Sequence, residues 1–179
     1  MDSIAVVDWD PSWVMIAAAL QAELRSKLPA DSLQHLEHIG STSVPGLAAK
    51  PVIDLMASAI DLDRFAAMAT GYLDRLDYLP AETGMTERLF YRRALGRTPT
   101  VHLHIVTAEA WSTQNERILR DFLVAHPDAS RRYGALKLRL AATIDHPLEY
   151  TRAKTALIQE LVDQARAERE LPPVNVWPE

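Results

Sequence analysis

A glycine followed by three hydroxyl residues gives one segment of the sequence the composition of an anion-binding loop. These residues are Gly40, Ser41, Thr42 and Ser43. Glycine lets backbone N–H groups approach a phosphate closely, and the hydroxyls add further donors. Lys50, at the far end of the loop, would add a positive charge. The segment therefore predicts a phosphate-binding loop, with a plain connecting turn between two strands as the alternative.

One carboxylate interrupts a near-continuous apolar run on the C-terminal side of this loop. The run extends from Val52 to Ala59 and carries Asp54, and its composition is typical of a strand covered on both faces. A carboxylate that is buried without a partner is strongly destabilising. We therefore expect Asp54 to be paired, hydrogen-bonded or bound to a cation, and to face Gly40 and Ser41 across a shared cavity.

Two histidines offer further ligands. His102 and His104 are two residues apart in a segment that is predicted to be a strand, so both side chains point to one face. If that strand lies beside Asp54, two imidazoles and one carboxylate could hold Zn²⁺, Mn²⁺ or Fe²⁺. The alternative is that the two histidines form structural hydrogen bonds or contact a phosphate directly.

Basic residues cluster once in this acidic chain. Arg88 and Arg92 share one face of a predicted strand with Phe90. One guanidinium group can donate two parallel hydrogen bonds to two oxygens of a phosphate or carboxylate, and Phe90 or Tyr91 could stack on a base. A solvated edge strand that is protected by its charges is the alternative.

Two tyrosine–lysine pairs have helical spacing. Tyr133 with Lys137, and Tyr150 with Lys154, are each four residues apart, so each pair lies on one helix face. We expect these pairs to close the pocket from the helical side. Ordinary stabilisation of a helix surface is the alternative.

Periodicity and turn residues predict the elements that position these side chains. Strands are expected at 33–39 and 52–59, with a hairpin formed by 88–94 and 100–107. Helices are expected between Pro11 and Pro29 and at 62–76, 109–125, 127–143 and 147–168. This order predicts an α+β fold, with a small mixed β-sheet, helices packed against it and a helical C-terminal third. A single domain, 1–170, would then precede an extended C-terminal tail, 171–179.

The stretch 38–55, HIGSTSVPGLAAKPVIDL, closely resembles the signature of the GrpB family, whose fold is similar to that of the nucleotidyltransferase superfamily. Further matches to the family lie at 88–92, 102–104 and 120–123, and at the two tyrosine–lysine pairs. The resemblance therefore extends over nearly the whole chain, and it implies a nucleotidyltransferase-like sheet.

In nucleotidyltransferases of that superfamily, a Gly-Ser pair holds a triphosphate and an Asp-x-Asp pair on the next strand binds a divalent metal. The resemblance thus implies that Gly40 and Ser41 contact phosphate, and that Asp54 is the first carboxylate for Mg²⁺ or Mn²⁺, with Zn²⁺ if both histidines coordinate. On this reading Asp54 and Ser41 are the catalytic residues. The second position of the pair is Met56, which cannot coordinate a hard cation.

Three functions are consistent with these residues. The first is a nucleotidyltransferase-like protein that binds a nucleotide or another phosphorylated small molecule with one divalent metal, and whose candidate reaction is nucleotidyl transfer. The second is a non-catalytic ligand-sensing or accessory module, as in family members fused to dephospho-coenzyme A kinase. The third is a metal-dependent hydrolase.

Bulk composition narrows the partners and the compartment. A net charge of -5 disfavours duplex nucleic acid, because that affinity depends on many Lys and Arg contacts with phosphates. No apolar run approaches the roughly 20 residues that span a bilayer, so no membrane partner is expected. Cysteine is absent, which is typical of a reducing compartment, and the cytoplasm is the predicted location. The sequence indicates no oligomeric state.

Overall fold

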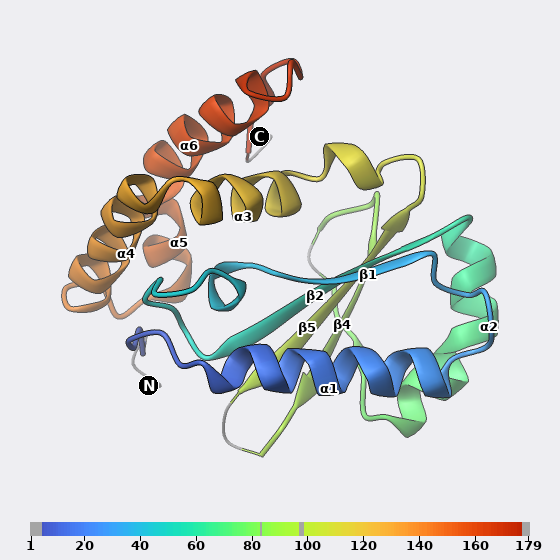
Figure 1. The fold of residues 1–179 in the computed structure, drawn as a ribbon. Coiled ribbons are helices and arrows are strands. Elements are labelled where there is room, and N and C mark those ends of the chain that lie inside the picture. Colours follow the sequence, from blue (N-terminus) through green and yellow to red (C-terminus); the bar gives the residue numbers. More distant parts are fainter. Residues whose placement is uncertain (1–4, 83, 97–98, 177–179) are drawn as a thin grey trace.

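A five-stranded mixed sheet forms the centre of the computed structural model, which describes residues 5–82, 84–96 and 99–176 (Figure 1). Its strands are β1 (His35–Ile39), β2 (Val52–Ala59), β3 (Leu79–Pro80), β4 (Leu89–Ala94) and β5 (Thr100–Thr107). The strand order is β1-β2-β5-β4-β3. Strands β2 and β5 are parallel, and the other neighbours are antiparallel. The predicted hairpin is therefore present as β4 and β5, and the predicted α+β fold is confirmed.

Within the described part of the chain, six α-helices pack around the sheet. They are α1 (Ser12–Lys27), α2 (Leu62–Arg75), α3 (Asn115–Ala125), α4 (Pro127–Ala141), α5 (Pro147–Ala153) and α6 (Thr155–Ala167). Short 3-10 turns, η1 (Ser41–Ser43) and η2 (Trp111–Thr113), precede β2 and α3 respectively. In Figure 1, α3 to α6 lie together as one group, apart from α1 and α2. Within the described residues, no helix combines the length and the apolar character that crossing a membrane requires.

Helices α1 and α2 cover one face of the sheet with apolar side chains. Trp13 and Leu24 of α1 and Phe65 of α2 are buried in the same cluster as Leu55 of β2 and Leu103 of β5. Full burial of a side chain of this size stabilises the fold by roughly 1.5–3 kcal/mol. This face is therefore the main core, and it leaves the opposite face available for polar groups.

The opposite face carries the polar residues of the central strands. In the β2–β5 pairing, Asp54 lies opposite His102, and in the β4–β5 pairing Arg92 lies opposite His102 and Phe90 opposite His104. Directly paired residues point to the same face of a sheet. The register thus brings Asp54 and both histidines onto one face, as the sequence predicts.

The C-terminal helices pack around the loop that joins β1 to β2. Val44 and Leu47 of this loop are buried in a second apolar cluster with Ile118 of α3, Tyr133 of α4 and Leu161 of α6. The helical group is therefore held against the loop by a core of its own.

Several predicted boundaries differ from the structure, and the helix expected at 109–125 begins only at Asn115, after η2. The single helix expected at 147–168 is divided at Lys154 into α5 and α6, where the Lys154 N–H bonds the carbonyl of Thr151 in a tighter turn. The tail from 171 to 176 has neither helix nor strand, and Gln159 of α6 fastens it by bonding the backbone of Val174 and Val176. The last three residues of the predicted tail lie outside the described residues.

Candidate functional site

The turn after β1 is built around Gly40 and lies directly against Asp54. Gly40 has φ +72°, a left-handed backbone conformation that residues other than glycine rarely adopt. A Cβ atom at this position would lie 2.3 Å from Oδ2 of Asp54. Glycine is therefore required both for the backbone conformation and for the space, and the carboxylate faces the Gly40 turn.

Two hydroxyls of the loop hold the loop itself in shape. Thr42 Oγ1 donates to the Val52 carbonyl at 2.8 Å, so it accepts at 2.9 Å from Nε2 of His38. Burial is the largest influence on His38 and lowers its pKa to about 4, so the ring is neutral at pH 7. Ser43 Oγ donates to the Gly40 carbonyl at 2.6 Å. Thr42 thus ties the loop to β1 and β2, Ser43 closes its turn, and the hydroxyl of Ser41 lies at the pocket.

A pocket of about 180 Å³ lies between this loop, the polar face of the sheet and the helical group. Its lining residues are Ser41, Thr42, Lys50, Val52, Asp54, His102, Tyr133, Lys137, Tyr150 and Lys154. They come from η1, the start of β2, β5, α4 and α5 and their immediate neighbours. Burial raises the pKa of Tyr133 in the helical wall, and the side chain of Ser41 acts against this larger effect by lowering that pKa. Both tyrosine–lysine pairs therefore line one cavity with Asp54.

Three lysines supply the positive charge of the pocket. Lys137 is only 3% exposed, and its Nζ finds no hydrogen-bond partner among the described residues. That Nζ lies 4.5 Å from the ring centroid of Tyr133. Lys50 and Lys154 lie 4.3 Å and 4.5 Å from the ring centroid of Tyr150. The ammonium groups are thus in contact with aromatic rings, and the most deeply buried of them has no polar partner in the described chain.

Burial and mutual repulsion make these ammonium groups more acidic. Burial, followed by the charge of Lys154, lowers the pKa of Lys137 to about 7. Burial and the charge of Lys50 lower the pKa of Lys154 to about 8, against an opposing influence from Asp54. Burial also lowers the pKa of Lys50. An anion in the pocket would reverse these effects, because it favours the charged form of each lysine.

The carboxylate of the pocket is bonded to a histidine. Nδ1 of His102 donates to Oδ1 of Asp54 at 3.1 Å, which leaves Nε2 as the other polar atom of the ring. Nε2 is buried and has no hydrogen-bond partner among the described residues. Asp54 is the one acidic residue among the lining residues that the structure describes. The pocket therefore combines one paired carboxylate with two unpartnered nitrogen atoms.

Comparison with known proteins assigns the chain to a family. The model of the family described as GrpB protein matches residues 3–164. The chain belongs to the GrpB family. A UPF0157 protein of Pseudomonas aeruginosa is 34% identical over 176 residues, which cover 93% of this chain and 69% of the relative. A UPF0157 protein of Halalkalibacterium halodurans is 29% identical over 171 residues, which cover 92% of this chain and 84% of the relative.

The fold of this GrpB-family chain also matches a solved structure. The crystal structure of the conserved protein GrpB from Enterococcus faecalis superposes with a TM-score of 0.81 at 28% identity, covering 93% of this chain and 99% of that one. The names of these relatives state a family and no activity. The family resemblance seen in the sequence is thus confirmed, and the chemistry of the GrpB pocket has to be argued from its geometry.

The three metal ligands that the sequence suggests do not form one site in this GrpB-family structure. Asp54 and His102 are hydrogen-bonded to each other. His104 is directed to another partner, because its Nδ1 lies 3.5 Å from Nη1 of Arg88. Met56, at the position of the second carboxylate of a nucleotidyltransferase pair, is fully buried in an apolar cluster. Across residues 5–82, 84–96 and 99–176, no group of three His, Cys, Asp or Glu side chains could hold a metal ion. The side chains do not fit a three-ligand metal site, and metal binding stays a prediction.

Both suggested arginines lie outside the GrpB pocket. Arg88 donates to Glu116 at 2.6 Å and to Gln114 at 2.9 Å. Arg92 is exposed and does not line the pocket, although it shares a sheet face with His102. A larger cavity of about 470 Å³ adjoins Arg88 along β4 and the loop before it, but none of the three pocket lysines lines it. The structure thus separates the arginines from the residues that line the pocket.

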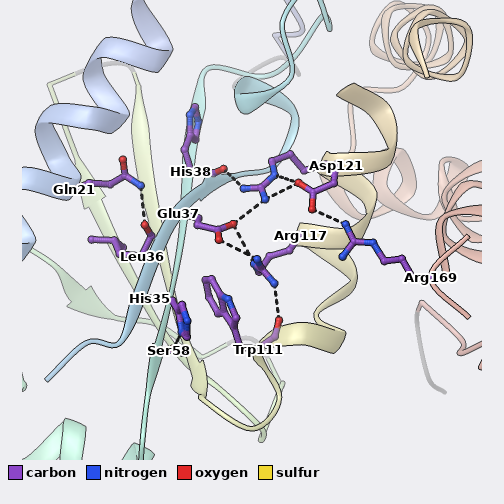
Figure 2. Close-up of polar contacts among 11 residues, drawn as sticks. Gln21, His35, Leu36, Glu37, His38, Ser58, Trp111, Arg117, Asp121 and Arg169 are labelled. Carbon is purple, nitrogen blue, oxygen red and sulfur yellow. Dashed lines mark hydrogen bonds and ion pairs between the residues drawn. The ribbon is translucent and has the colours of Figure 1, made fainter. Parts of the chain in front are cut away.

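A network of ion pairs holds the start of the loop that joins β1 to β2 (Figure 2). Sequence patterns do not reveal this network. Arg117 of α3 donates to both carboxylate oxygens of Glu37 in β1, at 2.9 Å and 3.1 Å. Arg120 donates to the His38 carbonyl at 2.9 Å, two residues before the turn at Gly40. The partners are about 80 residues apart in sequence, so spacing gives no signal for them. These contacts fix the end of β1 and, with it, the start of the loop.

Proposed function

We propose that the chain binds a phosphorylated small molecule, whose phosphoryl group lies between the Gly40–Ser43 loop and the pocket lysines. The buried ammonium of Lys137, which has no hydrogen-bond partner in the described chain, carries this proposal. A buried charge without a partner is costly, and a group of this kind either is neutralised or is paired with a ligand. An anionic oxygen would supply the missing partner.

The other lining groups support the same ligand. Lys50 and Lys154 place further positive charge around the cavity. The hydroxyl of Ser41 and the N–H groups of the turn add neutral donors of the kind that bind phosphate at glycine-rich loops. Asp54 orients the His102 ring through their hydrogen bond.

This proposal concerns binding, and the geometry of the pocket supports binding better than catalysis. One carboxylate lines the described part of the pocket, whereas a two-metal mechanism needs several oxygen ligands. Nucleotidyl transfer and metal-dependent hydrolysis therefore stay predictions from the family resemblance. The accessory or sensing module is the function that the lining residues support most directly.

Thermal unfolding in the presence of simple anions tests the proposal. Inorganic phosphate should raise the melting temperature with EDTA present, and potassium chloride at matched ionic strength should not. A ligand at 100 times its Kd stabilises by about 2.7 kcal/mol, which corresponds to roughly 5–11 °C for a chain of this size. The Lys137→Met variant should lose this response.

Lys27 provides the matched control, because it is exposed at the end of α1 and the Lys27→Met change removes the same charge. The control should respond to phosphate as the wild type does. If Lys137→Met and Lys27→Met respond equally, or if phosphate stabilises none of the three proteins, the proposed function is wrong.

A further inference from the structure

We infer that the ligand of this pocket is a compact polyanion, either free pyrophosphate or phosphate or the phosphoryl group of a small ester, and that the pocket has no subsite for a nucleobase. This inference rests on the proposed function and narrows its substrate class. It departs from the nucleotide that the fold resemblance suggests, and three features of the pocket carry it.

The first feature is the size of the cavity. Pockets that enclose drug-sized ligands have volumes of roughly 300–1,000 Å³, and a nucleoside triphosphate is a ligand of that size. The pocket around Asp54 and Lys137 has a volume of about 180 Å³. This space encloses a phosphate, a pyrophosphate or a short ester, whereas the ribose and base of a nucleoside triphosphate would extend beyond it.

The second feature is that the aromatic rings near the pocket are already in contact with other groups. Bases are commonly recognised by stacking on an open aromatic face. The ammonium of Lys137 lies against the Tyr133 ring, and the ammonium groups of Lys50 and Lys154 lie against the Tyr150 ring. Both tyrosines are almost completely buried. Neither ring presents the open face that a base requires.

The two aromatic residues that the sequence suggests for stacking are engaged as well. Phe90 packs against the rings of His102 and His104, with centroids 5.2 Å and 4.8 Å away. Tyr91 is buried in the main core on the other side of the sheet. Neither residue lines the pocket that holds the lysines.

The third feature is the kind of polar group that the pocket leaves unsatisfied. A base edge needs both donors and acceptors, whereas Nζ of Lys137, which is buried and without a partner among the described lining residues, offers donors only. Three lysines face one carboxylate, and that carboxylate is bonded to His102. This surplus of positive charge matches an anion with two or more negative charges.

Calorimetric titration of matched ligand pairs, in EDTA, tests the inference. Tripolyphosphate and ATP share a triphosphate and differ by adenosine, so we expect ATP to bind no more than tenfold more tightly than tripolyphosphate. Adenosine alone should give no heat of binding at millimolar concentration. Inorganic phosphate and glycerol 3-phosphate form the second pair, and the tighter of the two identifies whether the natural source is a free anion or a small ester.

The outcomes separate the inference from the function on which it rests. ATP that binds more than tenfold more tightly than tripolyphosphate, or adenosine that binds alone, would overturn the inference while anion binding stands. If none of the phosphates binds, the proposed function itself fails. Lys137→Met should lower the affinities for tripolyphosphate and for ATP by the same factor, and Lys27→Met should lower neither affinity. A loss of affinity confined to ATP would also contradict the inference.

Discussion

Replacing Lys137 by methionine should make the free protein more stable, although it removes a residue of the proposed site. The pKa of this lysine falls from 10.5 to about 7 on folding, and each pKa unit corresponds to about 1.4 kcal/mol. Keeping the ammonium charged in the folded pocket therefore costs on the order of 5 kcal/mol. Methionine fills a similar volume without a charge, so we expect roughly 1–4 kcal/mol of stabilisation at pH 7.

The stabilisation should depend on pH with a defined sign. Between the folded pKa of about 7 and the ordinary value of 10.5, the unfolded chain keeps a proton that folded Lys137 has released. The stability of the wild type therefore rises with pH in this window, and the full cost of the buried charge is present below pH 7. The difference between Lys137→Met and the wild type should be largest at pH 7 and below, and should shrink towards pH 10.

Urea unfolding at pH 6.5, 8 and 9.5 measures this difference, with Lys27→Met as the control for the loss of a positive charge at an exposed position. The control should change the free energy of unfolding by less than about 0.5 kcal/mol. A Lys137→Met variant that is less stable than the wild type at pH 6.5, or whose advantage is the same at all three values, would refute the reasoning.

Four further predictions follow from the same contacts. Gly40→Ala should destabilise the fold by about 2 kcal/mol or more in urea unfolding, because its Cβ would collide with the Asp54 carboxylate at a positive φ; a change under about 0.5 kcal/mol would contradict the close approach. Sulfate keeps its charge from pH 6 to 9, so its calorimetric affinity should fall above the pKa of free Lys137, roughly tenfold for each pH unit until the higher pKa of the sulfate-bound form is reached, and a flat profile would exclude that lysine. Arg117→Ala should cost roughly 1–3 kcal/mol, because Glu37 loses both of its hydrogen bonds from this residue; a double variant that also carries Glu37→Gln should recover part of the loss, and simple additivity would argue against the pairing. If the predicted metal binds at Asp54, Mn²⁺ should raise the melting temperature of the wild type and not of Asp54→Asn; an equal response would place the metal elsewhere.

The local parts of the site were predictable from the sequence. A Gly-Ser turn after a strand, followed by an apolar strand with one acid, placed Gly40 next to Asp54 as the structure does. The alternation of a strand placed His102 and His104 on one face, and helical spacing placed Lys137 with Tyr133. Each of these relations involves neighbouring residues or one sheet register, which sequence periodicity describes well.

The parts that depend on tertiary packing were not predictable. Helical spacing could not show that Lys137 is buried without a partner, because this depends on how α4 packs against the loop. The cluster of arginines suggested a ligand site, but Arg88 is paired with Glu116, which follows 28 residues later. The break at Lys154 also had no local signal, since neither glycine nor proline marks it.

The titration of Lys137 itself, followed through the ¹⁵N shift of its Nζ with and without sulfate, tests the anion-binding pocket most directly. The signal is assigned by its absence in Lys137→Met. Burial predicts a pKa of about 7 in the free protein, and saturating sulfate should raise this pKa by at least about one unit, because an adjacent anion stabilises the ammonium. A pKa near 10.5 that sulfate leaves unchanged would show that Lys137 is neither desolvated nor part of an anion site.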